Sequence, residues 1–178
     1  MPNFHNFTTR AKEAIRKAHE LAIERGQTHV SPVHLLSALT MQDESVVIAV
    51  LDRLDIDIIA LTDMLLEALE GAEMSSSVAQ SYQLYLTPEL ARALEHAGKT
   101  AENLGDAYVG PEHLFIAALE YPGPAIEVLQ RSGIDKRRVL AVLKEVREHS
   151  VTDAEQPKKF RALSKYTRNL TKLAEENK

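Results

Sequence analysis

The chain contains no cysteine. This absence excludes a disulfide framework, a thiolate nucleophile and a cysteine zinc site, and nothing else in the sequence marks an oxidising compartment. No stretch reaches the roughly 18 apolar residues of a membrane span, and the first seven residues lack the cationic start and apolar run of a secretion signal. We therefore expect a cytoplasmic protein that is neither secreted nor membrane-bound.

Signatures of nucleotide binding and catalysis are also missing. The only glycines with phosphate-loop spacing, Gly105 and Gly110, are followed by proline instead of lysine. The seven histidines form no cluster at metal-ligand spacing, and no residue supplies a nucleophile or an oxyanion site. The sequence thus predicts a binding protein, not an enzyme, with no cofactor and no metal in this chain.

Positive charge is scarce outside one segment. The 178 residues carry a net charge of -5, but residues 158–178 hold seven Lys or Arg against two Glu, so the remainder is strongly acidic. An acidic body is poorly suited to the phosphate backbone of DNA or RNA. We expect no nucleic-acid partner.

What the chain does contain is an internal repeat. A shift of 79 residues aligns residues 30–36, VSPVHLL, with residues 109–115, VGPEHLF, and after a one-residue gap residues 50–57 match residues 128–135. Such order over so long a stretch indicates duplication. We define the first repeat as residues 7–70 and the second repeat as residues 86–147, together forming one domain over residues 1–150.

Each repeat is predicted to form four helices. Apolar residues at three-and-four spacing follow Thr8 and Thr87, which are candidate N-caps. Ser31-Pro32 and Gly110-Pro111 open two central apolar helices, because proline suits the first helical position. Third helices are expected near residues 44–54 and 124–132, and fourth helices, capped by Asp57 and Asp135, end near residues 70 and 149. The predicted fold class is all-α, with two pseudo-symmetric four-helix repeats.

Two further segments connect or follow the repeats. Residues 71–85 contain a Ser-Ser-Ser run without helical periodicity and predict a flexible or partly extended crossover. Residues 151–157 form a polar linker, after which an apolar stripe at helical spacing predicts a C-terminal linker helix within residues 151–178. Such a helix needs a covering surface, so we expect the natural chain to continue past Lys178.

His34 and His113 occupy matching places, two residues after a helix-opening proline. A matched pair is compatible with acid and base chemistry. A buried imidazole commonly satisfies a neighbouring backbone group, however, and duplication alone accounts for the symmetry. We favour the structural interpretation.

Glu112 breaks the symmetry, because the first repeat has Val33 in its place. A carboxylate in the first turn of a helix gains about 0.3 to 1 kcal/mol from the helix dipole. It can equally pair with a guanidinium or ammonium group of a bound peptide. The sequence leaves both interpretations open.

These residues resemble the N-terminal domain of the Clp ATPases, the ring-forming AAA+ unfoldases, and most closely the ClpB and ClpC branches. The resemblance is carried by the FTxxA motif that begins at Phe7, by the two Pro-x-His-Leu segments and by the ALE sequence at residues 118–120. Residues 162–171, ALSKYTRNLT, resemble the segment that enters the first AAA+ module. The resemblance covers nearly the whole chain.

The resemblance implies a mobile domain above a homo-hexameric ring, itself monomeric when isolated. It would recruit unfolded or tagged protein substrates and adaptor proteins into a groove between the repeats. ATP and Mg²⁺ would bind in the parent protein, outside this chain, and the parent could disaggregate proteins or feed a peptidase. A free-standing regulator or scaffold without an ATPase is the alternative.

The family's substrate positions correspond to Thr8, Asp106 and Glu112, and residues near His96 and Thr100 would line the groove wall. In ClpC-type members a Glu in each Pro-x-His-like segment recognises phosphorylated arginine. The first of these is Val33 here, which leaves that activity open.

If the second site is functional, the resemblance implies that Glu112 holds the guanidinium. Thr87 and backbone amides at a helix start would then meet the phosphate.

Overall fold

The computed structural model describes residues 4–71 and 84–147, and the predicted linker and C-terminal helix lie outside these ranges. The first repeat forms α1 (Thr9–Glu24), α2 (Pro32–Met41), α3 (Val46–Arg53) and α4 (Ile58–Gly71). The second forms α5 (Pro88–Asn103), α6 (Pro111–Ala118), α7 (Pro124–Arg131) and α8 (Lys136–Val146). A single turn of 3₁₀-helix, η1 (Phe4–Asn6), precedes them. The prediction of four helices per repeat is confirmed, although α8 ends about a turn earlier than expected.

The predicted N-caps begin their helices through side-chain hydrogen bonds. The oxygen atoms of Thr8, Thr87, Asp57 and Asp135 each accept a bond from the backbone N–H three residues further on, at 2.8 to 3.2 Å. Each bond satisfies one of the amide donors that a helix start leaves without an intrahelical partner. Local chemistry therefore fixes where four of the helices begin.

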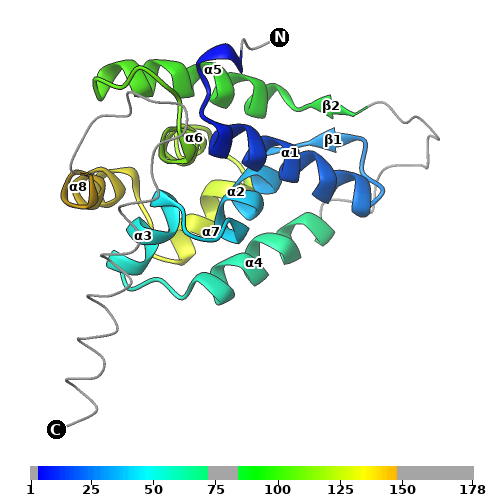
Figure 1. Ribbon diagram of the computed structural model, residues 1–178. Helices are drawn as coiled ribbons and strands as arrows, with labels where there is room; N and C mark the ends of the chain where they lie inside the picture. Colours follow the sequence, from blue (N-terminus) through cyan, green and yellow to red (C-terminus); the bar gives the residue numbers. More distant parts are fainter. Residues whose placement is uncertain (1–3, 72–83, 148–178) are drawn as a thin grey trace, which may run out of the picture.

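Helices α2 and α6 form the centre of the molecule. Residues 33–40 of α2 and residues 111–118 of α6 are all buried. The two helices contact each other, with α1 and α5 packed on one side and α4 on the other (Figure 1). A helix surrounded in this way has no solvent-facing side, which explains why the sequence shows no polar stripe here.

The fourth helices are not equivalent. Helix α4 lies along α2 and buries Leu61, Leu65 and Leu69 in the core. Helix α8 packs mainly against α3, touches α6 at few positions and buries only Val139 and Leu143. The end of α8 is therefore less firmly held by the apolar core than the end of α4.

The repeats also exchange backbone hydrogen bonds. Strand β1 (His29–Val30) pairs in parallel with strand β2 (Tyr85–Leu86), and Phe7 forms an isolated parallel bridge with Val109. Under the 79-residue shift Phe7 corresponds to Leu86 and Val30 to Val109, so the two bridges are equivalent. Each repeat therefore begins with a short backbone pairing to the other repeat. The all-helical prediction did not include this short sheet, because two-residue strands have no periodicity to detect.

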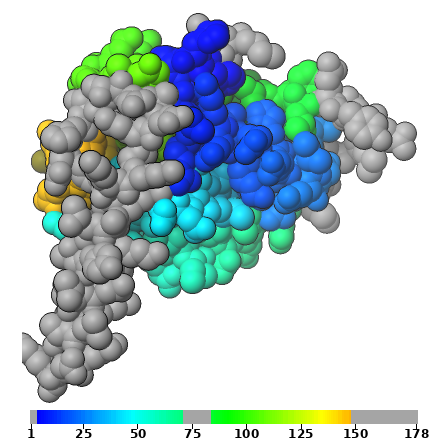
Figure 2. All heavy atoms as spheres, viewed as in Figure 1, coloured from blue at the N-terminus to red at the C-terminus, as the bar shows by residue number. Residues whose placement is uncertain are grey.

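Figure 2 shows one face of the molecule, in which the first repeat, blue to blue-green, forms most of the coloured surface. Within residues 4–71 and 84–147, no single helix has both the length and the apolarity to cross a membrane. Helices α2 and α3 reach these values only as a pair that bends by 85°.

Candidate functional site

Three of the residues named by the resemblance converge where α5 turns into α6. Thr8 donates its backbone N–H to the carbonyl of Val109 at 2.9 Å, Asp106 lies in the turn itself, and Glu112 occupies the first turn of α6. All three are buried. We call Asp106, Glu112 and His113 the α6 cluster.

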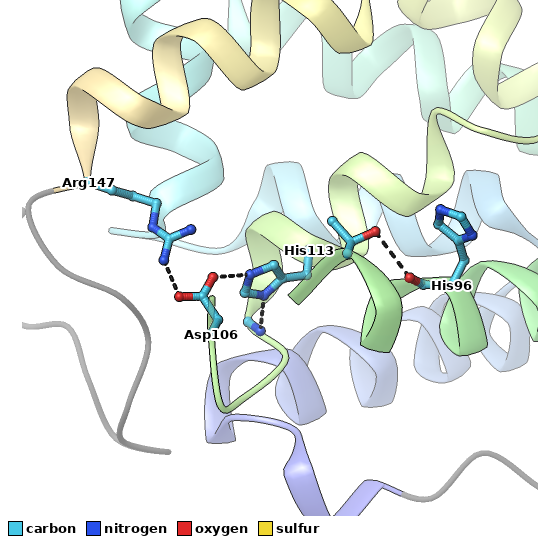
Figure 3. Close-up of polar contacts among 6 residues, drawn as sticks. His96, Asp106, His113 and Arg147 are labelled. Carbon is cyan, nitrogen blue, oxygen red and sulfur yellow. Dashed lines mark hydrogen bonds and ion pairs between the residues drawn. The ribbon is translucent and has the colours of Figure 1, made fainter. Parts of the chain in front are cut away.

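Asp106 and His113 form a buried pair at the centre of the cluster (Figure 3). The Nε2 atom of His113 lies 2.6 Å from Oδ2 of Asp106, and both side chains are 0% exposed. The backbone N–H of Gly110 donates to Nδ1 of His113 at 2.7 Å. Because Nδ1 accepts this bond, the hydrogen-bond network assigns the ring proton to Nε2, which donates it to the carboxylate.

Arg147, the first residue after α8, completes the pair from the other side. Its Nη2 atom forms an ion pair with Oδ1 of Asp106, and its side chain is only 13% exposed. Both carboxylate oxygens of Asp106 therefore have partners, one from the start of α6 and one from the end of α8 (Figure 3). A buried carboxylate needs such compensation, since burial without partners strongly disfavours its charge.

The first repeat has a neutral version of this arrangement. The backbone N–H of Ser31 donates to Nδ1 of His34 at 3.0 Å, and Nε2 of His34 donates to the amide oxygen of Gln27. The amide nitrogen of Gln27 donates in turn to the carbonyl of Leu69, near the end of α4, at 3.1 Å. Gln27 and Asp106 are therefore equivalent, and each ties a central helix to the end of a fourth helix.

These contacts confirm the structural interpretation of the two histidines, because each imidazole satisfies the backbone N–H at the start of its helix. Burial lowers the pKa of His34 from 6.5 to about 4, and the nearby charges of Arg25 and His19 add to this effect. His34 is therefore neutral at pH 7.

Glu112 has no counterpart to the Asp106 network. It is 4% exposed, and its carboxylate folds over Gly110, so that a Cβ added at Gly110 would lie 2.6 Å from Oε2. None of the ion pairs found within residues 4–71 and 84–147 involves Glu112. The second repeat thus carries two buried carboxylates where the first repeat has Gln27 and Val33, and only one of them is paired with an arginine.

The predicted groove-wall residues lie elsewhere. Thr100 donates its hydroxyl to the carbonyl of His96 at 3.1 Å, one turn earlier in α5. His96 lies apart from the Asp106 and His113 pair in Figure 3. The ring of His96 is partly exposed and lies edge-on to Tyr121, 3.9 Å from a carboxylate oxygen of Glu120. The groove between the repeats stays a prediction.

Thr87 also lies apart from Glu112. Its backbone N–H donates to the carbonyl of Val30 at 2.9 Å, which places it beside the start of α2 in the first repeat. The equivalent place beside α6 is occupied by Thr8. The neighbour of Glu112 is therefore Thr8 and not Thr87. The structure does not bring Thr87 and Glu112 together around one ligand.

Two members of these networks were not predicted from the sequence. Arg147 lies 41 residues from Asp106, and no local pattern connects them. Gln27 could have been found, because it directly follows the aligned Gly26 and therefore matches Asp106 under the same shift. Among the described residues no group of three or more His, Asp or Glu side chains could hold a metal ion.

Comparison with protein families identifies residues 6–132 as a match to the Clp repeat (R) N-terminal domain. The chaperone protein ClpB of Bacillus cereus is 31% identical over 177 residues, which covers 94% of this chain and 20% of that protein. ClpB of Propionibacterium freudenreichii is 34% identical over 172 residues, with 96% and 20% covered. The chain therefore spans about a fifth of the length of these relatives.

Solved structures show the same fold. The N-terminal domain of Hsp104 from Candida albicans superposes with a TM-score of 0.73 at 18% identity, over 85% of this chain and 98% of that one. A ClpV N-domain in complex with a VipB peptide superposes with a TM-score of 0.59 at 22% identity, over 80% and 89% of the two chains.

Proposed function

Because the chain belongs to the family of Clp repeat N-terminal domains, we propose that it recognises substrates and adaptors for an ATP-dependent chaperone. In this role it binds unfolded segments or adaptor proteins between its two repeats. The complex of a ClpV N-domain with a VipB peptide supports the proposal, since a domain of the same fold binds a peptide of a partner protein.

The observation that carries the proposal is the pair of buried carboxylates at the start of α6. Glu112 forms no ion pair with any described residue, and it replaces an apolar Val33 in the equivalent place. Glu112 therefore offers a carboxylate without a cation partner among the described residues, and a cationic side chain of a ligand would find a favourable partner there. The proposed ligand is a peptide segment with an arginine or lysine side chain among apolar residues.

The proposal extends to the parent protein. In the relatives the matched region is about a fifth of the chain, so we propose a cytoplasmic, homo-hexameric parent whose other domains bind ATP and Mg²⁺. The domain itself would act without a cofactor, and delivery to a peptidase belongs to the same proposal.

The test is a titration of the 178-residue chain with a chemically unfolded, carboxymethylated protein, followed by backbone amide shifts. We expect changes around Thr8, Asp106 and Glu112. The variant Glu112→Gln should weaken binding about tenfold, because a hydrogen bond to a charged group contributes about 1.5 kcal/mol or more.

A matched control is Glu89→Gln. Glu89 is exposed and follows the first proline of α5, as Glu112 follows the first proline of α6. The control should bind like the unmodified chain. Shifts confined to surfaces far from α6, or equal losses in both variants, would refute the proposal.

A further inference from the structure

Arg147 occupies a place where a cationic ligand group would bind. Its guanidinium pairs with Oδ1 of Asp106, whereas His113 contacts Oδ2. Because the carboxylate is fully buried, a ligand cation that takes the position of that guanidinium would reach it. The side chain of Arg147 is 13% exposed, and the residue directly follows α8.

We infer that Arg147 is an internal competitor, which fills the cation site of Asp106 when the domain is empty and leaves when a ligand guanidinium binds. The inference rests on the proposed function. It specifies a guanidinium as the ligand group and a change at the end of α8 as the consequence of binding. Departure of Arg147 releases the end of α8, from which the chain continues into the linker.

The packing of α8 allows this release. The helix buries only two apolar residues and touches α6 at few positions. Its C-terminal end is held by the ion pair with Asp106 and by an exposed ion pair between Glu145 and Arg53 at 3.4 Å. The N–H of Arg147 also donates to the carbonyl of Leu143 at 2.9 Å. A helix end with few buried contacts opens at low free energy, and the Asp106 ion pair is the buried one of the two, so its loss should increase local opening.

The first repeat shows what the same junction looks like without a switch. There the amide of Gln27 bonds to the backbone carbonyl of Leu69, on a helix that buries three leucines in the core. No charged side chain takes part in that bond, so a ligand cation has nothing to replace. Of these two junctions, the one in the second repeat has a cation bound to a buried carboxylate, directly after its fourth helix.

The probe for this exchange is Nα-acetyl-arginine amide, titrated into the 178-residue chain and followed by amide shifts of α6 and α8. The variant Arg147→Gln should bind the probe about tenfold more tightly, because removing an internal occupant raises the fraction of competent sites. Arg137→Gln is the matched control, since it removes the same charge from an exposed position of α8. Nα-acetyl-citrulline amide, which has no charge, should gain nothing from Arg147→Gln.

A second measurement needs no substitution. Hydrogen exchange of the amides near the end of α8 should become several-fold faster in the unmodified chain when the arginine probe is added, and should not respond to the citrulline probe. If Arg147→Gln fails to fold, this measurement still decides the question. The double variant Asp106→Asn with Arg147→Gln reproduces the neutral chemistry of Gln27, and it should fold but lose the gain in affinity.

An unchanged affinity in Arg147→Gln, or a gain that persists in the double variant, would overturn the inference. If Glu112→Gln weakens binding of the unfolded protein while Arg147→Gln leaves the arginine probe unaffected, only the inference fails. If the arginine probe binds as expected but the unfolded protein does not bind, only the proposed function fails.

Discussion

At the scale of single residues, His34 and His113 hold their helix starts with the same geometry and different acceptors. In both, the backbone N–H three residues earlier donates to Nδ1, and Nε2 donates to the residue seven positions earlier. That residue is an amide in the first repeat and a carboxylate in the second. The imidazole is therefore a shared structural element, whereas a charged acceptor for it occurs in the second repeat and a neutral one in the first.

The buried, neutral imidazole of His34 makes the free energy of unfolding depend on pH. The pKa of His34 is about 4 in the folded chain and 6.5 when exposed, so the unfolded chain takes up the proton first as pH falls. The contribution to stability is complete above pH 6.5 and is lost towards pH 4, amounting to about 3 kcal/mol. Denaturant unfolding between pH 7 and pH 4 measures it.

The variant His34→Gln should flatten that pH dependence, because glutamine three residues after Ser31 forms a capping box without titrating. His29→Gln, at an exposed position, is the control and should retain the slope. A slope that survives His34→Gln would contradict the assignment.

Asp106 supplies a second prediction at this scale. Asp106→Ala leaves Arg147 and His113 without their acceptor and should lower the free energy of unfolding by about 3 kcal/mol or more. Asp106→Asn keeps a neutral acceptor for His113, as Gln27 does for His34, so its loss should be about 1 kcal/mol. Urea unfolding at pH 7 distinguishes the two, and equal losses would argue that the carboxylate charge itself is required.

At the scale of helices, most of the fold could be predicted because the signals are local. An N-cap and the amide it satisfies are three residues apart, so Thr8 and Thr87 were identified from the sequence, and the apolar helices after Pro32 and Pro111 likewise. The contact between Arg147 and Asp106 could not be predicted, because it depends on how α8 lies on the rest of the molecule. For the same reason the sequence indicated Glu112 as a candidate but not its burial over Gly110.

The caps allow a direct test of local contributions. Thr87→Ala should lower the free energy of unfolding by about 1 kcal/mol, and Thr8→Ala by up to about 2 kcal/mol, because Thr8 is also buried. Serine at either position keeps the capping oxygen and should recover most of the loss. Thermal unfolding followed by circular dichroism provides the comparison, and an equal loss with serine would assign the effect to the methyl group.

At the scale of the whole molecule, the two repeats form one cooperative unit. Helices α2 and α6 are buried against each other, and both strand bridges join one repeat to the other. Separating the repeats would expose an apolar helix on each side, and a chain of about 80 residues has little surplus burial to offset this.

We therefore predict that residues 1–79 alone show no cooperative unfolding transition and poor amide dispersion, and that residues 80–178 behave alike. Mixing the two fragments should restore both signals. A fragment that stays monomeric and unfolds cooperatively by itself would show that the repeats are independent domains.

The segment before α1 and the residue after α8 both attach to the short stretch of residues 106–109. The N–H of Thr8 donates to the carbonyl of Val109 and the N–H of Val109 donates to the carbonyl of Asn6, while Arg147 pairs with the side chain of Asp106, three residues away. Tension between the N-terminal segment and the linker would therefore run across this turn, from a pair of backbone bonds to one ion pair, and would bypass the helical core. The weaker attachment, at Arg147, should yield first, so that the core stays folded while the linker is pulled.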